Sequence, residues 1–267
     1  MLIHMIHPTA NIHPKARLAS TVQVGPGAVI DEGVELGAHC IVGPYVYLTG
    51  LTTIGDRNRF HSGSVIGDAP QDLKYDGTPT RLRIGTDNVF REHVTVHRST
   101  KPEEETVIGS HNLLMANSHA GHNSRLGDHV ILANGVALGG YAQVGDRAFL
   151  GGNCLVHQFT RVGPLALMQG GAAISQDLPP FTIVRAVNCL CGLNGVGLRR
   201  AGIAAADRLE LKQLYRALFL SGKNLRAAVA QAEVEFTGSL AKVLLRFVAE
   251  SKRGVCTPCA AAGEADA

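Results

Sequence analysis

A large apolar residue recurs at every sixth position along the first two thirds of the chain. From Ile6 to Ile174, 25 of the 29 positions at this spacing hold Ile, Leu, Val, Phe or Met. The 45% hydrophobic share of the chain would place only about 13 there by chance. Glycine often comes next, as at Gly25, Gly109 and Gly145, and it permits the tight corners that must separate very short strands.

Three hexads close one coil of 18 residues, and stacked coils pair as parallel strands around a shared apolar ladder. We therefore predict an all-β fold, a left-handed parallel β-helix of hexapeptide repeats, over residues 1–180. The hexad pattern ends after Pro179-Pro180.

Helical spacing replaces the hexads in the last third of the chain. Leu211, Leu214 and Leu218 lie at helical intervals before Ser221-Gly222, a common helix end. Two more helices are predicted near 225–235 and 239–251. The pattern thus predicts a C-terminal α-helical domain over residues 181–254. The Ala- and Gly-rich residues 255–267 are predicted to form a disordered tail.

Cysteine usage and the absence of long apolar runs predict a cytoplasmic protein. Cys40 and Cys154 fall four residues after a ladder residue, where small side chains fill the coil interior, so the pattern predicts packing residues and no disulfide framework. No apolar run reaches membrane-spanning length, and the N-terminus lacks a signal-peptide pattern. A four-thiolate zinc site stays open as an alternative for four other cysteines: Cys189, Cys191, Cys256 and Cys259.

Positive charge is concentrated in the predicted helical domain. Residues 181–253 hold 12 Lys or Arg and five Asp or Glu, a net of +7, whereas residues 1–180 hold 13 and 15, a net of −2. This asymmetry indicates an acidic partner, for which an acidic carrier protein and a diphosphate-bearing substrate fit equally well. No nucleic-acid-binding motif is present, so no nucleic-acid partner is expected. Helices whose solvent-exposed faces simply carry basic residues would give the same charge asymmetry without any acidic partner.

The hexad register breaks at four positions, and function is expected where a rigid scaffold is interrupted. Positions 72 and 78 lie in a predicted loop over 68–83, and position 102 lies in one over 97–107. The fourth break is Ala120, which lies between His119 and His122.

The 18-residue coil places chemistry in one column at this fourth break. Counting 18 residues from His122 gives Gly140, and 18 more give Gln158, so these residues are expected on successive strands about 4.8 Å apart. Histidine can accept a proton from a hydroxyl near neutral pH, and glycine lets a carbonyl oxygen approach a backbone N–H. The column therefore favours acyl transfer. A plainer alternative is that His122 is an ordinary surface histidine, since the chain has twelve histidines.

Six motifs stand in the same order as in a known family. They are Gln71-Asp72-Leu73-Lys74-Tyr75, Val94-Thr95-Val96-His97-Arg98, Asn112-Leu113-Leu114-Met115, His119-Ala120-Gly121-His122, His157-Gln158-Phe159 and Gly197-Leu198-Arg199-Arg200. The chain thereby resembles the acyl-carrier-protein–UDP-N-acetylglucosamine O-acyltransferases of lipid A biosynthesis, from about residue 6 to Gly254. The hexads are shared by many transferases, whereas the Gln71–Tyr75 and His119–His122 motifs are much more specific.

This resemblance implies a homotrimer with active sites between subunits, which moves an R-3-hydroxyacyl chain from acyl carrier protein to the 3-hydroxyl of UDP-N-acetylglucosamine. No metal or other cofactor is implied beyond the phosphopantetheine of the carrier. His122 matches the general base and Gly140 the oxyanion donor. The positions implied to bind substrate are Asp72, Lys74, His119 and Gln158 for the glucosamine and phosphate, with Asn194 and Arg200 near the nucleotide and the carrier arm.

Several departures from the family pattern mark a divergent member. Asn123 stands where an acid usually follows the catalytic histidine, and an amide stabilises an imidazolium less than a carboxylate does. Tyr141 replaces a histidine, while Val196 and Ala201 replace charged residues near the nucleotide.

Three other functions stay open on the sequence alone. The first is a related acyltransferase with another sugar-nucleotide or amino-sugar acceptor. The second is a β-helix metalloenzyme that binds metal through His119, His122 and either His93 or His97. The third is a weakly active binding or scaffold protein.

Overall fold

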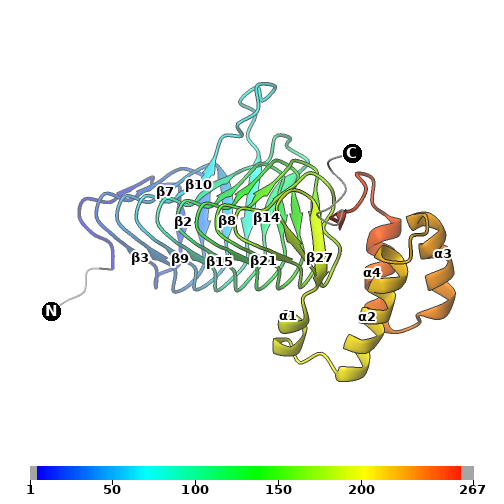
Figure 1. The fold of residues 1–267 in the computed structure, drawn as a ribbon. Helices are drawn as coiled ribbons and strands as arrows, with labels where there is room; N and C mark the ends of the chain where they lie inside the picture. Colours follow the sequence, from blue (N-terminus) through cyan, green and yellow to red (C-terminus); the bar gives the residue numbers. More distant parts are fainter. Residues whose placement is uncertain (1–4, 260–267) are drawn as a thin grey trace.

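The computed structural model describes residues 5–259 (Figure 1). Residues 6–178 wind into a left-handed parallel β-helix, and the helices α1–α4 pack at its C-terminal end (Figure 1). The predicted fold class is confirmed. Within the described residues, no helix combines the length and the apolar composition needed to cross a membrane.

Three sheets form the sides of the coil, and within the β-helix each strand pairs in parallel with the strand one coil away. The first sheet contains β1 (Asn11–Ile12), β4 (Val29–Ile30), β7 (Tyr47–Leu48), β10 (Val65–Asp68), β13 (Thr95–His97), β16 (His119–Ala120), β19 (Ala137–Leu138), β22 (Leu155–Val156) and β25 (Ala173–Ile174). The second contains β2 (Arg17–Leu18), β5 (Val34–Leu36), β8 (Leu51–Ile54), β11 (Arg81–Ile84), β14 (Glu105–Ile108), β17 (Arg125–Leu126), β20 (Gln143–Val144) and β23 (Arg161–Val162). The third contains β3 (Gln23–Val24), β6 (Ile41–Val42), β9 (Arg59–Phe60), β12 (Val89–Phe90), β15 (Leu113–Leu114), β18 (Ile131–Leu132), β21 (Phe149–Leu150), β24 (Leu167–Met168), β26 (Thr182–Arg185), β27 (Cys189–Leu193) and β28 (Thr257–Pro258).

The apolar ladder forms the core of the β-helix. Ladder residues such as Leu114, Leu132 and Leu150 are fully buried, and each packs against the equivalent residue one coil away. Cys40 and Cys154 are also fully buried, and their thiols donate to backbone carbonyls of the next coil. The packing role predicted for these two cysteines is confirmed.

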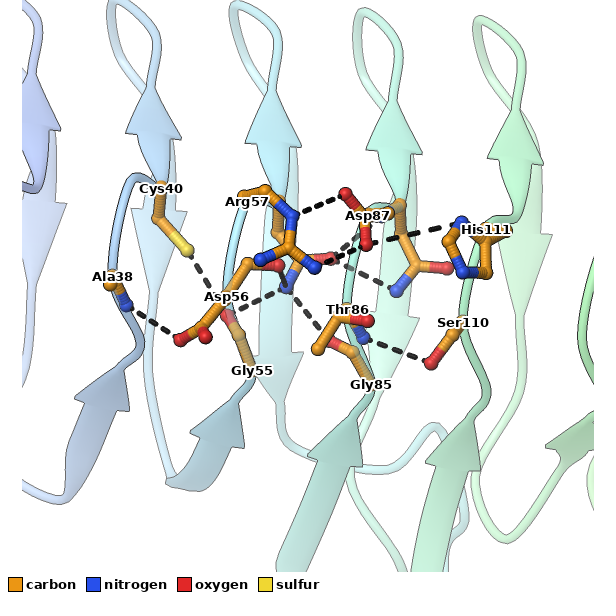
Figure 2. A network of polar contacts seen from close by, with 12 residues as sticks. Ala38, Cys40, Gly55, Asp56, Arg57, Gly85, Thr86, Asp87, Ser110 and His111 are labelled. Carbon is orange, nitrogen blue, oxygen red and sulfur yellow. Dashed lines mark hydrogen bonds and ion pairs between the residues drawn. The ribbon is translucent and has the colours of Figure 1, made fainter.

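The corner between the second and third sheets shows how polar side chains satisfy the turns (Figure 2). A carboxylate oxygen of Asp56 accepts from the backbone N–H of Ala38 at 2.8 Å, one coil away. Farther along this corner, the Arg57 guanidinium donates two hydrogen bonds of 2.7 Å to Asp87 (Figure 2). Such exposed ion pairs add little stability, so this corner mainly satisfies backbone groups that the short strands leave unpaired.

Both predicted loops leave the coil where the hexad register breaks. The first spans residues 69–80 between β10 and β11 and projects above the β-helix in Figure 1. Arg98 anchors its base by donating to the Gly67 carbonyl at 2.8 Å and to the Tyr75 hydroxyl at 3.2 Å. The second loop is residues 98–104, between β13 and β14.

The C-terminal region contains the three predicted helices and one further short helix. They are α1 (Gly195–Arg200), α2 (Ala205–Phe219), α3 (Leu225–Glu235) and α4 (Ser239–Ala249). The predicted helical domain over 181–254 is wrong in its first residues, because β26 and β27 form an antiparallel hairpin on the third sheet. Ile183 and Val184 stack on β24 and so extend the sheet beyond Pro179-Pro180, although the spacing from Leu167 to Ile183 is 16 and not 18.

The predicted disordered tail over 255–267 is wrong for residues 255–259. β28 pairs with β27, and Val255 and Cys256 are buried because they pack against the end of the core. Residues 260–267 lie outside the described part of the chain.

The expectation of no disulfide is also corrected, because this pairing brings Cys189 and Cys259 into a disulfide, with Cα atoms 5.0 Å apart. The other two cysteines of the four-thiolate alternative are free thiols, with Cys191 exposed and Cys256 buried.

The alternation of side chains predicts the effect of truncating a ladder residue. Leu126 points into the core at 3% exposed, while its neighbour Arg125 points outward from the second sheet. Leu126→Ala should lower the free energy of unfolding by about 2–5 kcal/mol, because it leaves a cavity in the ladder. Arg125→Ala should change it by less than about 0.5 kcal/mol. Urea denaturation followed by circular dichroism measures both, and equal losses would contradict this assignment of the two faces.

Candidate active site

The corner between the first and second sheets brings the predicted column together. His122 follows β16, and its carbonyl accepts from the N–H of Tyr141 at 2.9 Å. One coil farther, the carbonyl of Gly140 accepts from the N–H of Phe159 at 3.0 Å. His122, Gly140 and Gln158 therefore occupy equivalent places in three successive coils, as the 18-residue period predicts. All three line one cleft of about 600 Å³.

The His122 ring lies directly over Gly140. A Cβ atom built on Gly140 would lie only 2.5 Å from Nε2 of His122, so any other residue would displace the ring. The N–H of Gly140 makes no hydrogen bond within residues 5–259. An unpaired backbone donor beside an imidazole nitrogen is the arrangement that stabilises an oxyanion formed next to a general base.

Two further histidines lie beside His122 in the cleft. His119 comes from β16 and hydrogen-bonds Thr95 Oγ1 through Nδ1 at 2.7 Å. His97, from the end of β13, packs edge-on against His119 with ring centroids 4.9 Å apart. His97 is 6% exposed, and its Nδ1 has no hydrogen-bond partner in the described structure.

Burial keeps these two histidines neutral. It lowers the pKa of His119 from 6.5 to about 4, with smaller contributions in the same direction from His97 and His122. Burial also lowers the pKa of His97, which the carboxylate of Asp68 partly opposes. A neutral imidazole can donate at one nitrogen and accept at the other, so His119 and His97 are suited to binding hydroxyl groups.

The structure divides the other predicted site residues between two places. Gln158 and His119 line the cleft with His122, whereas Asp72 and Lys74 lie on the 69–80 loop. There the Asp72 carboxylate accepts from the backbone N–H of Lys74 at 2.9 Å, which shapes a turn at the loop tip. Gln71 of the same loop does reach the cleft.

Asn194 and Arg200 line a second pocket of about 390 Å³ on the third sheet, beside Phe149 and Leu167. Asn194 caps α1: its Oδ1 accepts from the N–H of Gly197 at 2.9 Å, and its Nδ2 donates to the Leu165 carbonyl at 2.9 Å. Within one chain these residues are therefore separate from the His122 cleft.

Sequence reasoning missed His97 and Gln71 as cleft residues. His97 directly follows the ladder residue Val96, which pairs with Ala120. This pairing places His97 beside the His119–His122 segment and could have been inferred from the ladder positions. Gln71 lies on a loop whose course the hexad period does not determine. Within residues 5–259 no three His, Cys, Asp or Glu side chains are arranged to hold a metal ion, so one chain does not form the histidine site of the metalloenzyme alternative.

The hexapeptide repeats place the chain in the hexapeptide class of transferases. The model of bacterial hexapeptide transferases matches residues 15–50 and 105–140. The model described as UDP N-acetylglucosamine O-acyltransferase, domain 2, matches residues 177–256.

Individual relatives narrow the class to one family. Proteins named acyl-[acyl-carrier-protein]–UDP-N-acetylglucosamine O-acyltransferase from Saccharophagus degradans and Akkermansia muciniphila are 45% and 46% identical, each over 94% of this chain and 98% of the relative. The UDP-N-acetylglucosamine acyltransferase structure from Francisella novicida has a TM-score of 0.92 and 32% identity, over 95% of this chain and 94% of that one. The chain belongs to the UDP-N-acetylglucosamine O-acyltransferase family, which confirms the resemblance.

The lowered pKa of His119 predicts how stability changes with pH. The unfolded chain takes up a proton near pH 6.5, but the folded chain resists it down to about pH 4. Stability is therefore lost as pH falls through this window. His119→Gln should reduce that loss by up to about 3 kcal/mol. Urea midpoints at several pH values between 4 and 7 measure this, with His39→Gln on an exposed corner as the control. An unchanged loss in the His119 variant would contradict a buried neutral imidazole.

Proposed function

We propose that this protein transfers an R-3-hydroxyacyl chain from acyl carrier protein to the 3-hydroxyl of UDP-N-acetylglucosamine, the first step of lipid A biosynthesis. The observation that carries the proposal is the position of His122 Nε2 over Gly140, whose N–H makes no hydrogen bond in the described chain. The names of the relatives support the same donor and acceptor.

The proposed reaction is a direct attack on the thioester. His122 Nε2 takes the proton of the sugar hydroxyl as its oxygen bonds to the thioester carbon. The negative charge on the carbonyl oxygen is stabilised by the N–H of Gly140. When the intermediate collapses, the C–S bond breaks and the His122 imidazolium returns its proton to the leaving thiolate of phosphopantetheine. The base and the oxyanion donor both belong to the protein, so the proposal includes no metal or further cofactor.

The other site residues are assigned to substrate binding in this proposal. His119 and Gln158 hold the glucosamine from inside the cleft, while Asp72 and Lys74 hold the sugar and phosphate from the 69–80 loop. Asn194 and Arg200 contact the nucleotide and the carrier arm. The cleft continues past Leu155 to Ala173 and Val187, an apolar end that suits an acyl chain.

We also propose a homotrimer, because the charged outward side chains are concentrated on one of the three sheets. The outward side chains of the second sheet include Arg17, Glu35, Arg83, Glu105, Arg125 and Arg161. Those of the third sheet include Val89, Leu113, Ile131, Phe149 and Leu167, and those of the first include Val29, Tyr47, Val65, Ala137, Leu155 and Ala173. Apolar faces of this extent are typical of subunit interfaces.

Contact between the third sheet of one copy and the first sheet of the next would complete the site. The Asn194–Arg200 pocket lies beside Phe149 and Leu167 on the third sheet, and the His122 cleft lies beside Leu155 on the first. Rotational symmetry would repeat this contact between each pair of neighbours. The two separate pockets of one chain would then face each other across each interface.

A cytoplasmic location is part of the proposal. Four of the six cysteines are free thiols, namely Cys40, Cys154, Cys191 and Cys256. Free thiols in this proportion are typical of a reducing compartment, and the Cys189–Cys259 disulfide is the one feature that argues against it.

Replacing the base tests the reaction. His122→Asn should lower kcat by about 100-fold or more, because asparagine cannot take up the hydroxyl proton. His39→Asn is the matched control, since asparagine tolerates the left-handed backbone at His39, where φ is 60°. Transfer from 3-hydroxyacyl carrier protein to UDP-N-acetylglucosamine is measured for both variants and compared with other UDP-sugars. Activity on another sugar alone would favour the alternative acceptor, and unchanged activity in His122→Asn would remove His122 from the mechanism.

A charge on the apolar third sheet tests the assembly. Phe149→Arg should give monomers, because a buried guanidinium would have no partner at the interface. Gln143→Arg, on the charged second sheet, should stay trimeric. Light scattering after size-exclusion chromatography measures both masses. A trimeric Phe149→Arg variant, or a monomeric native protein, would contradict this interface.

A further inference from the structure

Two residues that depart from the family pattern converge on one carboxylate oxygen. Asn123 stands where an acid is usual, and its Nδ2 donates to Oε2 of Glu104 at 2.6 Å. Tyr141 stands where a histidine is usual, and its hydroxyl donates to the same Oε2 at 2.9 Å. Glu104 ends the 98–104 loop directly before β14, 19 residues from Asn123. The acid absent at position 123 is thus supplied from another part of the chain.

The donors and acceptors around Asn123 determine which way its amide points. A carboxylate only accepts hydrogen bonds, so Nδ2 must face Glu104. A backbone N–H only donates, and that of Thr100 points at Oδ1 at 3.1 Å. Both neighbours require the same orientation. The amide oxygen therefore faces His122, 2.9 Å from its Nδ1.

This orientation in turn selects the tautomer of His122. Because an amide oxygen only accepts, the proton of the neutral imidazole must be on Nδ1. Nε2 then carries the lone pair, and Nε2 is the nitrogen that lies over Gly140. The basic nitrogen is thus the one that lies beside Gly140, as the proposed reaction requires.

We propose that Glu104 is a positioning residue for His122, acting through the Asn123 amide and held in place by Tyr141. This inference rests on the proposed role of His122 as the base. The carboxylate polarises the amide, so Oδ1 becomes a stronger acceptor for the Nδ1 proton of the imidazolium that forms during the reaction. The Glu104 carboxylate thereby acts on the His122 imidazole through the Asn123 amide, without contacting the ring.

The surrounding contacts hold this relay rigidly. Asn123 is 5% exposed, and its left-handed backbone, with φ of 59°, is stabilised by a 2.7 Å hydrogen bond from its N–H to Thr106 Oγ1. The hydroxyl of Ser99 donates to the Glu104 carbonyl at 2.8 Å and so holds the loop. The Tyr141 ring stacks on Phe159, with centroids 4.7 Å apart, and meets the edge of His122. The relay is therefore organised before substrate binds.

The relay allows a carboxylate at position 104 or at position 123, but not at both. With Asp at 123, two carboxylate oxygens would meet where Nδ2 now donates to Glu104 at 2.6 Å. One would have to bind a proton or move away. Asn123→Asp alone is therefore expected to impair the enzyme, although it restores the usual residue of the family.

Steady-state kinetics of four variants test this coupling. Glu104→Gln keeps the shape of the side chain but removes its charge, and it should lower kcat by about tenfold while KM changes by less than about twofold. Glu103→Gln removes a charge from the exposed neighbour, which has no hydrogen bond or ion pair within residues 5–259, and it should match the native enzyme. Asn123→Asp should fall below native kcat, and adding Glu104→Gln to it should recover at least half of the native value. Equal kcat for the two glutamate variants, or a gain from Asn123→Asp with Glu104 present, would overturn the proposal.

A spectroscopic measurement separates this inference from the choice of substrate. The ring ¹⁵N shifts of His122, assigned by their loss in His122→Asn, report the tautomer in the free enzyme without acceptor or donor. The native protein should show the proton on Nδ1, and Glu104→Gln should move the Nδ1 proton resonance upfield as its hydrogen bond weakens, unlike Glu103→Gln. A proton on Nε2 in the native protein, or identical shifts in both variants, would overturn the relay. Failure of acyl transfer to UDP-N-acetylglucosamine with the predicted shifts present would overturn only the proposed function.

Discussion

The burial of one side chain in every six is the constraint on which the rest of the structure depends. Each inward residue contacts its counterparts one coil away on both sides, so no coil can slip without exposing its whole apolar row. Since the corners follow the strands, residues 18 apart meet at each corner. The N–H of Tyr141 bonded to the His122 carbonyl, and that of Phe159 bonded to Gly140, are consequences of this register. The geometry of the site is therefore inherited from the core.

The cleft lies along the first sheet, at its corner with the second sheet, and this position determines how its histidines can act. His97 and His119 lie against the sheet, and burial favours their uncharged forms. His122 lies farther out, at the turn, where its ring reaches Gly140. Removal from water disfavours the charged form of a histidine, so two of the three cleft histidines are kept neutral by their surroundings.

The departures from the family pattern form a connected set. Asn123 and Tyr141 taken singly indicate a weakened base, because neither can carry a negative charge beside His122 at neutral pH. In the structure both donate to Glu104, whose carboxylate acts through the amide. Burial raises the pKa of Tyr141, and its hydrogen bond to Glu104 acts in the same direction, so the phenol stays protonated and available as a donor. The polar network beside His122 therefore still contains a carboxylate, which contacts the Asn123 amide and not the imidazole itself.

The sequence by itself determined the β-helix, the loop positions, the three main C-terminal helices and the His122–Gly140–Gln158 column, because periodic burial converts residue number directly into position. Only the tertiary structure decided the pairing of Glu104 with Asn123, the hairpin of β26 and β27, and the disulfide of Cys189 with Cys259. Each of these contacts has at least one partner in a segment that leaves the 18-residue period, so sequence spacing carries no information about their distance. Their partners are chosen by hydrogen bonding and packing against a core that must already exist.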